Sequence, residues 1–333
     1  MPAEMVNVSS CYRIRDERLP HADGRTAALL GEVVRDVVRT AKLDARTQRV
    51  AVVIGTGLRE LRTLERRAVE GNLDADCSLD VDAAVREQLP EVTDIVTVSN
   101  ACAAGGYALA MGQDIVLADE ADAVIVAGVD TLTASMLAMI GLVAKTPTSR
   151  VRPFDVDRTG VLLGEGAAAV VLEPQRPGMP RLRGVGIGCD AYNETTPDAD
   201  GIAATMRAAH ADAGVGPRDI DLVVSHGTGT GLNDPTESAA LTRVFGSGRA
   251  LPVTALKGSI GHTSGSAALV NLIVAVRAIG EGAIPGVVGL DTPITETAQL
   301  ELLTTTTLRP VHRAQINAFG FGGVNAVAIV EAA

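Results

Sequence analysis

The sequence predicts an α/β fold built from two similar halves. Short runs rich in Val, Ile and Ala alternate with longer Ala-rich stretches of helical character, which is typical of βα units around a mostly parallel sheet. With 333 residues, 47% of them hydrophobic, the chain can bury a large core. It contains 35 glycines and no Trp, so its packing must rest on aliphatic side chains and close backbone approach.

The expected strands form two series. In the first half they fall at 49–57, 94–102, 122–130 and 167–173, and in the second at 221–229, 258–265 and 325–331. A strand followed by Gly-Thr-Gly occurs at Gly55 and again at Gly227, and a final apolar strand ends at Glu173 and again at Glu331. Either the halves are duplicated, or these are similarities common to βα units. Prolines and charges at 173–184 place the boundary there, which gives halves of 1–178 and 179–333.

Composition excludes several function classes. A net charge of −11 without a Lys/Arg-rich block argues against nucleic-acid binding. Four cysteines, at 11, 77, 102 and 189, have neither zinc-site nor disulfide-scaffold spacing. Charged residues stand where a signal peptide would be apolar, and no run approaches the roughly 20 apolar residues of a membrane span. We expect a cytoplasmic protein in a reducing compartment, with no membrane partner and with neither a metal nor a cofactor.

Cys102 follows an expected strand and precedes a run of small residues that can form a helix. A thiol at that junction would lie against the positive end of the helix dipole and its free N–H groups, which favours the thiolate of a nucleophile. The alternative is a small core residue, because unpaired cysteine is often fully buried. The residue alone leaves both interpretations open.

Two histidines, His226 and His262, are expected just past strands in Gly-rich turns. The carboxyl ends of strands in an α/β sheet are where ligand crevices form, so both are candidates for chemistry with Cys102. His210 has helical neighbours and is expected at the surface. His21 and His312 have no motif around them.

Six segments make the chain resemble a β-ketoacyl synthase of the elongating, acyl-carrier-protein-dependent type, in the thiolase superfamily. In the order of that family, from about residue 49 to 330, they are SNACAAG at 99–105, RPFDVDRTGVLLGEGAAAVVLE at 152–173, DAYNETTPD at 190–198, HGTGTGLNDPTE at 226–237, LKGSIGH at 256–262 and NAFGFGGVNA at 317–326. A degradative thiolase would have a second cysteine where this chain has GFGG. A starter-type synthase would pair cysteine with one histidine and an asparagine.

The resemblance implies a thiolase-like fold, with two pseudo-twofold-related halves in αβαβα layers, and a decarboxylative Claisen condensation. Cys102 would hold the acyl chain as a thioester. Backbone N–H groups of Cys102 and Phe321 would form the oxyanion hole, and Phe321 would also gate the acyl pocket, whereas Phe319 is expected to serve packing. His226 and His262 would donate to the enolate formed from a malonyl thioester.

Five further residues receive roles from the same resemblance. Lys257 would act through charge and hydrogen bonding together with Glu165, because a buried ammonium must be paired. Thr195, Thr228 and Thr230 would contact the pantetheine arm. The alternatives are a surface position for Lys257 and ordinary turn hydrogen bonds for the three threonines.

The chain departs from the family mainly before the nucleophile. The strand that normally opens the fold has no counterpart at 1–20, and the segments 67–96 and 130–150 are short. Asn193 replaces a His of the family pattern, and Asn233 replaces a Gly. The missing segments help to form the cap, the acyl tunnel and part of the dimer contact in relatives, so the sequence leaves substrate length and self-association open.

Three functions remain open. The first is condensation in fatty-acid or polyketide-type biosynthesis, the second is acyl transfer by the same cysteine without condensation, and the third is a non-catalytic partner comparable to a chain-length factor. The expected partners are an acyl- or malonyl-loaded acyl carrier protein and an identical or related ketosynthase subunit. Because carrier proteins are acidic, a basic helix face is needed; Arg59, Arg62, Arg66 and Arg67 offer either that face or an ordinary solvated one.

Overall fold

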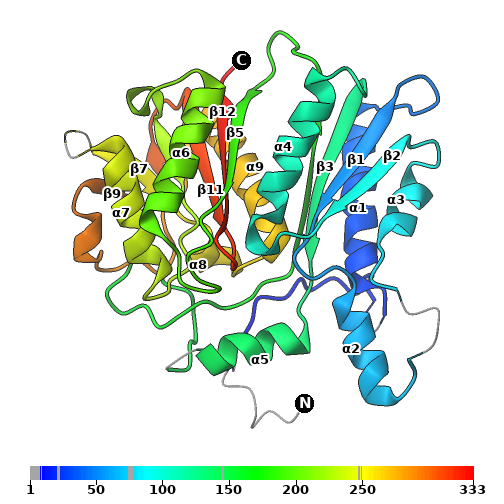
Figure 1. The fold of residues 1–333 in the computed structure, drawn as a ribbon, viewed down its shortest axis with the longest axis horizontal. Helices are drawn as coiled ribbons and strands as arrows, with labels where there is room; N and C mark the ends of the chain where they lie inside the picture. Colours follow the sequence, from blue (N-terminus) through cyan, green and yellow to red (C-terminus); the bar gives the residue numbers. More distant parts are fainter. Residues whose placement is uncertain are drawn as a thin grey trace. The chain divides into compact units, whose positions relative to one another are not determined.

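The computed structural model describes residues 8, 10–20, 23–73, 78–143, 146–246, 248 and 250–333 (Figure 1). The chain divides into two compact units. Unit 1 comprises 1–143, 163–174 and 263–269, and unit 2 comprises 144–162, 175–262 and 270–333. Both units therefore take a short segment from across the predicted boundary at 178/179, and the division of the chain at that residue stays a prediction. Cys77 and His21 lie outside the described residues.

Unit 1 contains a four-stranded sheet in the order β2-β1-β3-β4. Strand β1 is parallel to β2 and β3, and β3 is antiparallel to β4. The bounds are β1 Val50–Gly55, β2 Asp94–Val98, β3 Ala123–Asp130 and β4 Gly166–Leu172. Its helices are α1 Arg25–Ala41, α2 Leu61–Glu70, α3 Asp82–Gln88, α4 Ala104–Leu117 and α5 Ala134–Val143.

The two faces of the unit 1 sheet are both covered, which explains why its central strands read as continuous apolar runs. All eight residues of β3 are buried. Ile125 and Val129 belong to the core cluster that also contains residues of α1 and α3. Val124 and Val126 face the other way, where a Cβ on Gly112 of α4 would meet them at 3.4 and 2.7 Å.

Unit 2 contains a six-stranded sheet in the order β5-β12-β11-β6-β7-β9. Strands β11, β6, β7 and β9 are parallel neighbours, whereas β12 is antiparallel to both β11 and β5. The bounds are β5 Arg181–Cys189, β6 Leu222–Val224, β7 Leu251–Thr254, β9 Leu300–Leu302, β11 Arg313–Phe319 and β12 Val324–Glu331. A separate antiparallel pair joins β8 Ala283–Ile284 and β10 Thr307–Leu308.

Helices α6 Ala199–Ala213 and α7 Asn233–Phe245 share a core cluster with this sheet. Helix α6 is capped at both ends. The Asp198 carboxylate accepts the Gly201 N–H at its N-terminus, and Gly214 adopts φ 65° at its C-terminus. The remaining elements are α8 Lys257–Ile260 and α9 Ala267–Glu281, with short 3₁₀ turns at Ala101–Ala103, Pro217–Asp219, Ser264–Ser266 and Thr295–Thr297.

The predicted α/β class is confirmed, and the two units repeat one topology. The order β2-β1-β3-β4 in unit 1 corresponds to β7-β6-β11-β12 in unit 2, with the same parallel and antiparallel neighbours. The strand at Gly55 thus corresponds to the strand before Gly227, as the recurring Gly-Thr-Gly indicated. The five-layer stacking concerns how the units lie against each other and stays a prediction.

One predicted strand is wrong. Residues 258–265 form the helical turn α8 and a 3₁₀ turn instead of a strand. The glycines of GSIGHTSG serve tight packing here, because a Cβ on Gly258 would lie 1.9 Å from the Val288 carbonyl oxygen. Close approach, rather than extension, explains this composition.

The unit 1 sheet ends at β4 among the described residues, whereas the corresponding β12 is covered by β5. The N-terminal segment reaches this edge only at Tyr12, which forms an isolated bridge with Gly164. Five of the seven β4 residues are half-buried, compared with two of the eight in β12. The described residues thus contain no strand equivalent to β5 in unit 1, in keeping with the predicted absence of the opening strand.

One described stretch, Ser264–Glu281, is long and apolar enough to cross a membrane. The expectation that no apolar run approaches the length of a membrane span is therefore wrong for this stretch. Within the protein 56% of this window is buried, which is typical of a core helix.

Candidate active site

His226 follows β6 in a turn that the next helix holds in place. Its backbone N–H donates to Oε1 of Glu237 at 2.8 Å, and the N–H of Gly227 donates to Oε2 at 2.8 Å. Gly227 has φ 43°, and a Cβ there would lie 2.7 Å from that of Ala255, so the turn requires glycine. The strand-end position predicted for His226 is confirmed.

A second carboxylate from the same helix organises the continuation of this turn. Asp234 accepts the N–H groups of Thr228 at 3.0 Å and of Phe154 at 2.7 Å. Burial raises the pKa of Asp234 to about 6, and the donated hydrogen bonds oppose that rise. The acidic residues of NDPTE are therefore the framework of the loop, because buried N–H groups need acceptors.

Lys257 lies at the start of α8 with only 4% of its surface exposed. Its Nζ donates to the backbone oxygen of His226 and lies 3.3 Å from Nδ1 of the same residue. The expected burial of this lysine is thus confirmed, and the surface alternative is wrong. Its contact with His226 was not predicted from the sequence.

His262 and His226 lie edge to face, with ring centroids 5.2 Å apart and an interplanar angle of 83°. Burial, followed by the positive charge of Lys257, holds the pKa of both imidazoles well below the usual 6.5, and His262 lowers that of His226 further. Both rings are therefore neutral at pH 7. His262 follows the helical turn α8, so the strand expected before it is wrong. Its position beside His226 nevertheless brings the two histidines together, as predicted.

The hydrogen bonds to His226 fix its tautomer. The backbone N–H of Phe319 donates to Nδ1 at 3.3 Å, and the ammonium of Lys257 is also a donor toward that nitrogen. A nitrogen that accepts has no proton, and a neutral imidazole carries one proton. His226 therefore has its proton on Nε2, which makes that nitrogen a hydrogen-bond donor for a ligand.

Cys102 lies in unit 1, in the 3₁₀ turn that leads from β2 into α4, and 7% of its surface is exposed. The preceding residue, Ala101, adopts φ 47°, a conformation uncommon outside glycine and frequent at functional turns. The start of α4, directly after this turn, packs closely on β1, since a Cβ on Gly55 would lie 2.7 Å from backbone atoms of Ala104. The junction of strand and helix predicted for the thiol is confirmed.

Asp130, at the end of β3, holds the loops around this turn in unit 1. Its carboxylate accepts from Gly57 N–H, Gly265 N–H, Leu58 N–H and the Thr56 hydroxyl at 2.6–2.8 Å. Burial raises the pKa of Asp130 to about 6, against the effect of these hydrogen bonds.

Glu165 lies in unit 1, where Arg25 binds its carboxylate with two hydrogen bonds of 2.9 and 2.7 Å. Both side chains are almost fully buried. The N–H of Ile14 also donates to Glu165 at 3.1 Å. Arg25 was not foreseen from the sequence as the partner of Glu165, and the pairing of Glu165 with Lys257 stays a prediction.

The threonines form turn hydrogen bonds. The hydroxyls of Thr228 and Thr230 lie 2.9 Å apart, and Thr230 accepts the Asn233 N–H at 3.0 Å. The N–H of Thr195 donates to Oδ1 of Asn193 at 2.9 Å. These contacts leave a pantetheine role as a prediction.

Phe321 occupies the Gly-rich turn between β11 and β12 and is 38% exposed. That exposure is compatible with its predicted gating role, which stays a prediction. Phe319 packs in the unit 2 core, as expected, and its ring centroid lies 5.5 Å from that of His226.

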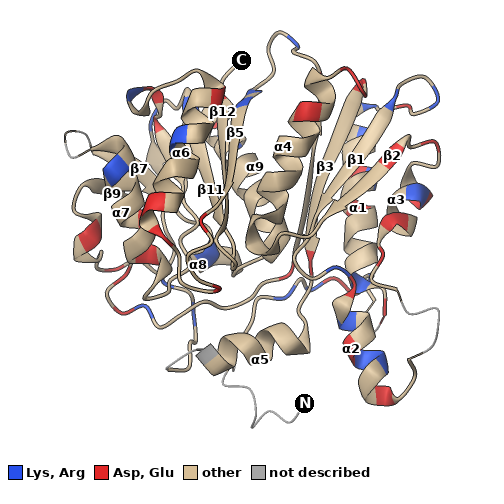
Figure 2. Ribbon diagram, in the orientation of Figure 1, with Lys and Arg blue, Asp and Glu red and all other residues tan. Residues whose placement is uncertain are grey.

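The surface position expected for His210 is wrong. His210 is 4% exposed rather than at the surface, and its Nε2 lies 2.7 Å from Oε1 of Gln315. For the arginines of α2, Arg66 and Arg67 both bind Asp23, and Arg62 donates to the Leu132 carbonyl oxygen at 3.1 Å; the choice between a basic docking face and an ordinary solvated face stays a prediction. Figure 2 shows both signs of charge on α2.

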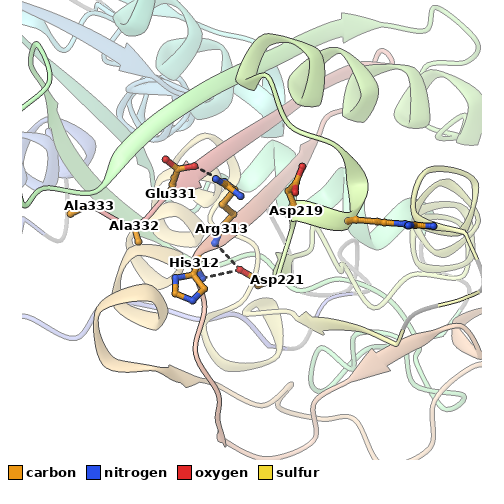
Figure 3. Close-up of a pocket in the computed structure, with 8 residues that line it drawn as sticks. Asp219, Asp221, His312, Arg313, Glu331, Ala332 and Ala333 are labelled. Atoms are coloured by element: carbon orange, nitrogen blue, oxygen red, sulfur yellow. Dashed lines mark hydrogen bonds and ion pairs between the residues drawn. The ribbon is translucent and has the colours of Figure 1, made fainter.

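A surface cavity of about 460 Å³ lies elsewhere on unit 2 (Figure 3). Asp221, which precedes β6, and Arg313, which begins β11, line it. His226 and Phe319 lie at the opposite ends of the same strands. The cavity therefore lies at the N-terminal ends of β6 and β11, whereas His226 lies beyond the C-terminal end of β6.

Comparison with known proteins decides the family. Residues 12–177 match the model of the beta-ketoacyl synthase N-terminal domain, and residues 179–291 match that of the C-terminal domain. The chain belongs to the β-ketoacyl synthase family. The expected resemblance is thereby confirmed.

Curated relatives agree with this assignment. Nodulation protein E of Rhizobium leguminosarum bv. trifolii is 36% identical over 69% of this chain and 59% of its own length. The 3-oxoacyl-[acyl-carrier-protein] synthase 2 of Coxiella burnetii is 30% identical over 71% of this chain and 61% of its length. The chain thus spans about 60% of the length of these relatives.

Solved structures show the thiolase-like ketosynthase fold. The ishigamide ketosynthase/chain length factor superposes with a TM-score of 0.86 at 29% identity and covers 96% of this chain and 87% of that one. A beta-ketoacyl synthase from Burkholderia phymatum gives a TM-score of 0.87 at 22% identity, covering 98% of this chain and 89% of that chain.

Proposed function

We propose that this protein is a condensing enzyme that joins a Cys102-bound acyl group to a malonyl-type thioester with loss of carbon dioxide. The observation that carries the proposal is the buried, neutral His226 with its proton fixed on Nε2, beside His262 and Lys257. A donor that stays neutral and preorganised in a water-poor site is suited to stabilise a developing enolate oxygen.

The first half-reaction uses Cys102. Its thiolate attacks the carbonyl carbon of an acyl thioester, the bond from that carbon to the carrier sulfur breaks, the carrier leaves as a thiolate, and the acyl group becomes a thioester of Cys102. The N–H groups of Cys102 and Phe321 are the proposed oxyanion donors for the tetrahedral intermediate. The position of Cys102 before the 14-residue helix α4 supports the thiolate form through the helix dipole.

The second half-reaction uses His226 and His262. The bond between the carboxylate carbon and the α-carbon of the malonyl group breaks, carbon dioxide leaves, and the electron pair forms an enolate whose oxygen accepts from Nε2–H of His226. The enolate carbon then attacks the Cys102 thioester. A carbon–carbon bond forms, the Cys102 thiolate is released, and the product is a 3-oxoacyl thioester.

Lys257 and Glu165 have supporting roles in this proposal. The ammonium of Lys257 disfavours protonation of both histidines, and it anchors His226 through the backbone oxygen. Glu165 neutralises Arg25 inside unit 1. Both roles are electrostatic, and neither residue needs to exchange a proton with the substrate.

An acyl carrier protein is the proposed carrier of both substrates, with Thr195, Thr228 and Thr230 next to its pantetheine arm. A homodimer, or a heterodimer with a related ketosynthase subunit, is the proposed assembly. The pairing of Arg66 and Arg67 with Asp23 lowers the positive charge that α2 offers to such a carrier.

The test is acylation followed by condensation. The protein and Cys102→Ala are incubated with a panel of acyl thioesters, and intact mass with peptide mapping identifies the adduct. Malonyl carrier is then added. An adduct on Cys102 followed by a 3-oxoacyl product supports condensation, and an adduct without that product supports acyl transfer to another acceptor.

The third function, a non-catalytic partner subunit, has one observation in its favour: the ishigamide structure contains a ketosynthase/chain length factor and superposes closely on this chain. Retention of Cys102 opposes it. In the same assay, a partner subunit would form no adduct with any donor.

A further inference from the structure

A continuous row of buried polar side chains crosses the interior of unit 2 and ends at the His226 turn. It begins at His210 on α6, continues through Gln315 and Asn317 on β11, and reaches Glu237 on α7. All four are at most 4% exposed. The chemistry proposed above uses none of the first three, so their burial needs another explanation.

The hydrogen bonds of the row have a single direction. The amide of Gln315 donates to Oδ1 of Asn317 at 2.8 Å, so its Oε1 is the acceptor for Nε2 of His210 at 2.7 Å. Asn317 donates in turn to Oε1 of Glu237 at 2.9 Å. Burial lowers the pKa of His210, so this histidine is a neutral donor with its proton on Nε2.

Glu237 connects this row of side chains to the backbone of His226. The oxygen that accepts from Asn317 also accepts the His226 N–H at 2.8 Å, and the other oxygen accepts the Gly227 N–H at 2.8 Å. The Asn233 amide also donates to the second oxygen, at 3.3 Å, so rotation of the Glu237 carboxylate would break all four bonds together. The amide of Asn317 is what keeps the carboxylate in this orientation from the side of the sheet.

Strand β11 controls His226 a second time. Gln315, Asn317 and Phe319 alternate along the strand and so point to one face. The N–H of Phe319 donates to Nδ1 of His226, while Asn317 acts on its backbone through Glu237. The positions of both the backbone and the imidazole of His226 therefore depend on residues of one strand, β11.

We propose that His210 and Gln315 are positioning residues for His226, holding Asn317 and Glu237 in the arrangement that presents Nε2–H of His226 to the substrate. This inference rests on the proposed condensation. The row belongs to the half-reaction that uses His226, so it should not affect acylation of Cys102.

The test compares three variants of the full-length protein. His210→Leu removes the donor. His210→Gln keeps an N–H group at the same reach. Met206→Ala truncates a fully buried residue of the same helix outside the row, and so controls for loss of stability.

Four quantities are measured for each variant. They are the rate of Cys102 acylation, the single-turnover rate and KM for condensation with malonyl carrier, and the ¹⁵N signals of the His226 imidazole. The last reports the tautomer whether or not the protein condenses. Its assignment comes from His226→Ala.

His210→Leu is expected to acylate at the wild-type rate with an unchanged KM for malonyl carrier. Its condensation rate should fall about tenfold or more, because small displacements of a catalytic group carry large rate penalties, and its His226 should populate both tautomers. His210→Gln and folded Met206→Ala should behave as wild type. If His210→Leu does not fold, Gln315→Met, which preserves length and removes both amide contacts, takes its place.

Wild-type condensation rate and tautomer in His210→Leu would overturn the inference. Equal losses in His210→Gln and Met206→Ala would also overturn it, because they would assign the effect to packing. If the wild-type protein does not condense at all, the proposed function fails, and the tautomer measurement alone decides whether the row positions His226.

Discussion

The backbone N–H of Phe319 lies 3.3 Å from Nδ1 of His226 and donates to it. Nδ1 is therefore an acceptor, and the single proton of the neutral ring is on Nε2. The sequence motif NAFGFGG thus contributes to the site through a main-chain donor, in addition to the packing expected for Phe319. Four predictions follow from this and from the contacts around the two motifs.

Replacement of His226 should separate the two half-reactions. His226→Ala removes the proposed enolate donor and should slow condensation by about 100-fold or more, while Cys102 acylation continues. His226→Gln has an amide N–H near the position of Nε2–H and should retain more activity than alanine. Single-turnover rates measure this. Equal losses in both variants would show that the Nε2–H donor is not the property that matters.

Condensation should persist as the pH falls through 6.5, where an ordinary histidine becomes protonated. The lowered pKa values of His226 and His262 mean that, below pH 6.5, the unfolded chain binds protons that the folded protein does not. The contribution of these neutral rings to the free energy of unfolding is therefore complete above the pKa that histidine has in the unfolded chain. It is lost as the pH falls toward the lower pKa that the rings have in the folded protein. An NMR titration measures both rings. Protonation of either at or above pH 6.5 would contradict this account.

Glu237→Gln should destabilise the protein and impair condensation. The carboxylate accepts from two backbone N–H groups and two side-chain amides, and a glutamine amide would direct a donor at one of those donors. The cost is about 1–3 kcal/mol in the free energy of unfolding. Glu296→Gln, at an exposed position, is the matched control and should unfold like wild type in urea. Wild-type stability of Glu237→Gln would refute the framework role of this carboxylate.

Two glycine-to-alanine changes in helices should have opposite effects. Gly105 of α4 allows close approach to unit 1 backbone, because a Cβ there would lie 2.4 Å from the Gly265 carbonyl oxygen. Gly105→Ala should therefore lower the midpoint of thermal unfolding and slow Cys102 acylation, although alanine is the better helix former. Gly280 of α9 has no atom within 4 Å of such a Cβ.

Gly280→Ala should consequently stabilise the protein by about 0.5–1 kcal/mol through helix propensity alone. Calorimetry measures both variants. A stable, rapidly acylated Gly105→Ala protein would mean that the turn before α4 tolerates displacement of its neighbours.

The sequence predicted the strands at Gly55 and Glu173, the turn of Cys102 and the turn of His226, because each joins a β-branched run to glycines in a local pattern. It failed at 258–265, where glycines allow close packing of a helical turn rather than extension. It also failed at His210, because the partner that buries this side chain, Gln315, lies 105 residues away. Local periodicity does not contain that contact.

The sequence did not reveal the roles of Asp234, Glu237 and Arg25, for a related reason. The segment NDPTE was recognised as part of a motif, but only the tertiary structure shows that its carboxylates accept backbone N–H groups of the preceding turn. The ion pair of Arg25 with Glu165 spans 140 residues. Acidic residues at the second and fifth positions of a helix that follows a Gly-rich turn are the signal that would have indicated the first two.

The most direct test of the central claim is a single turnover of pre-acylated protein with a malonyl carrier labelled with ¹³C in its free carboxylate. The account predicts one labelled carbon dioxide and one 3-oxoacyl thioester for each acyl group lost from Cys102, with no 3-oxoacyl thioester from Cys102→Ala. Loss of the acyl group from Cys102 without labelled carbon dioxide, or no acylation of Cys102 by any donor, would contradict it.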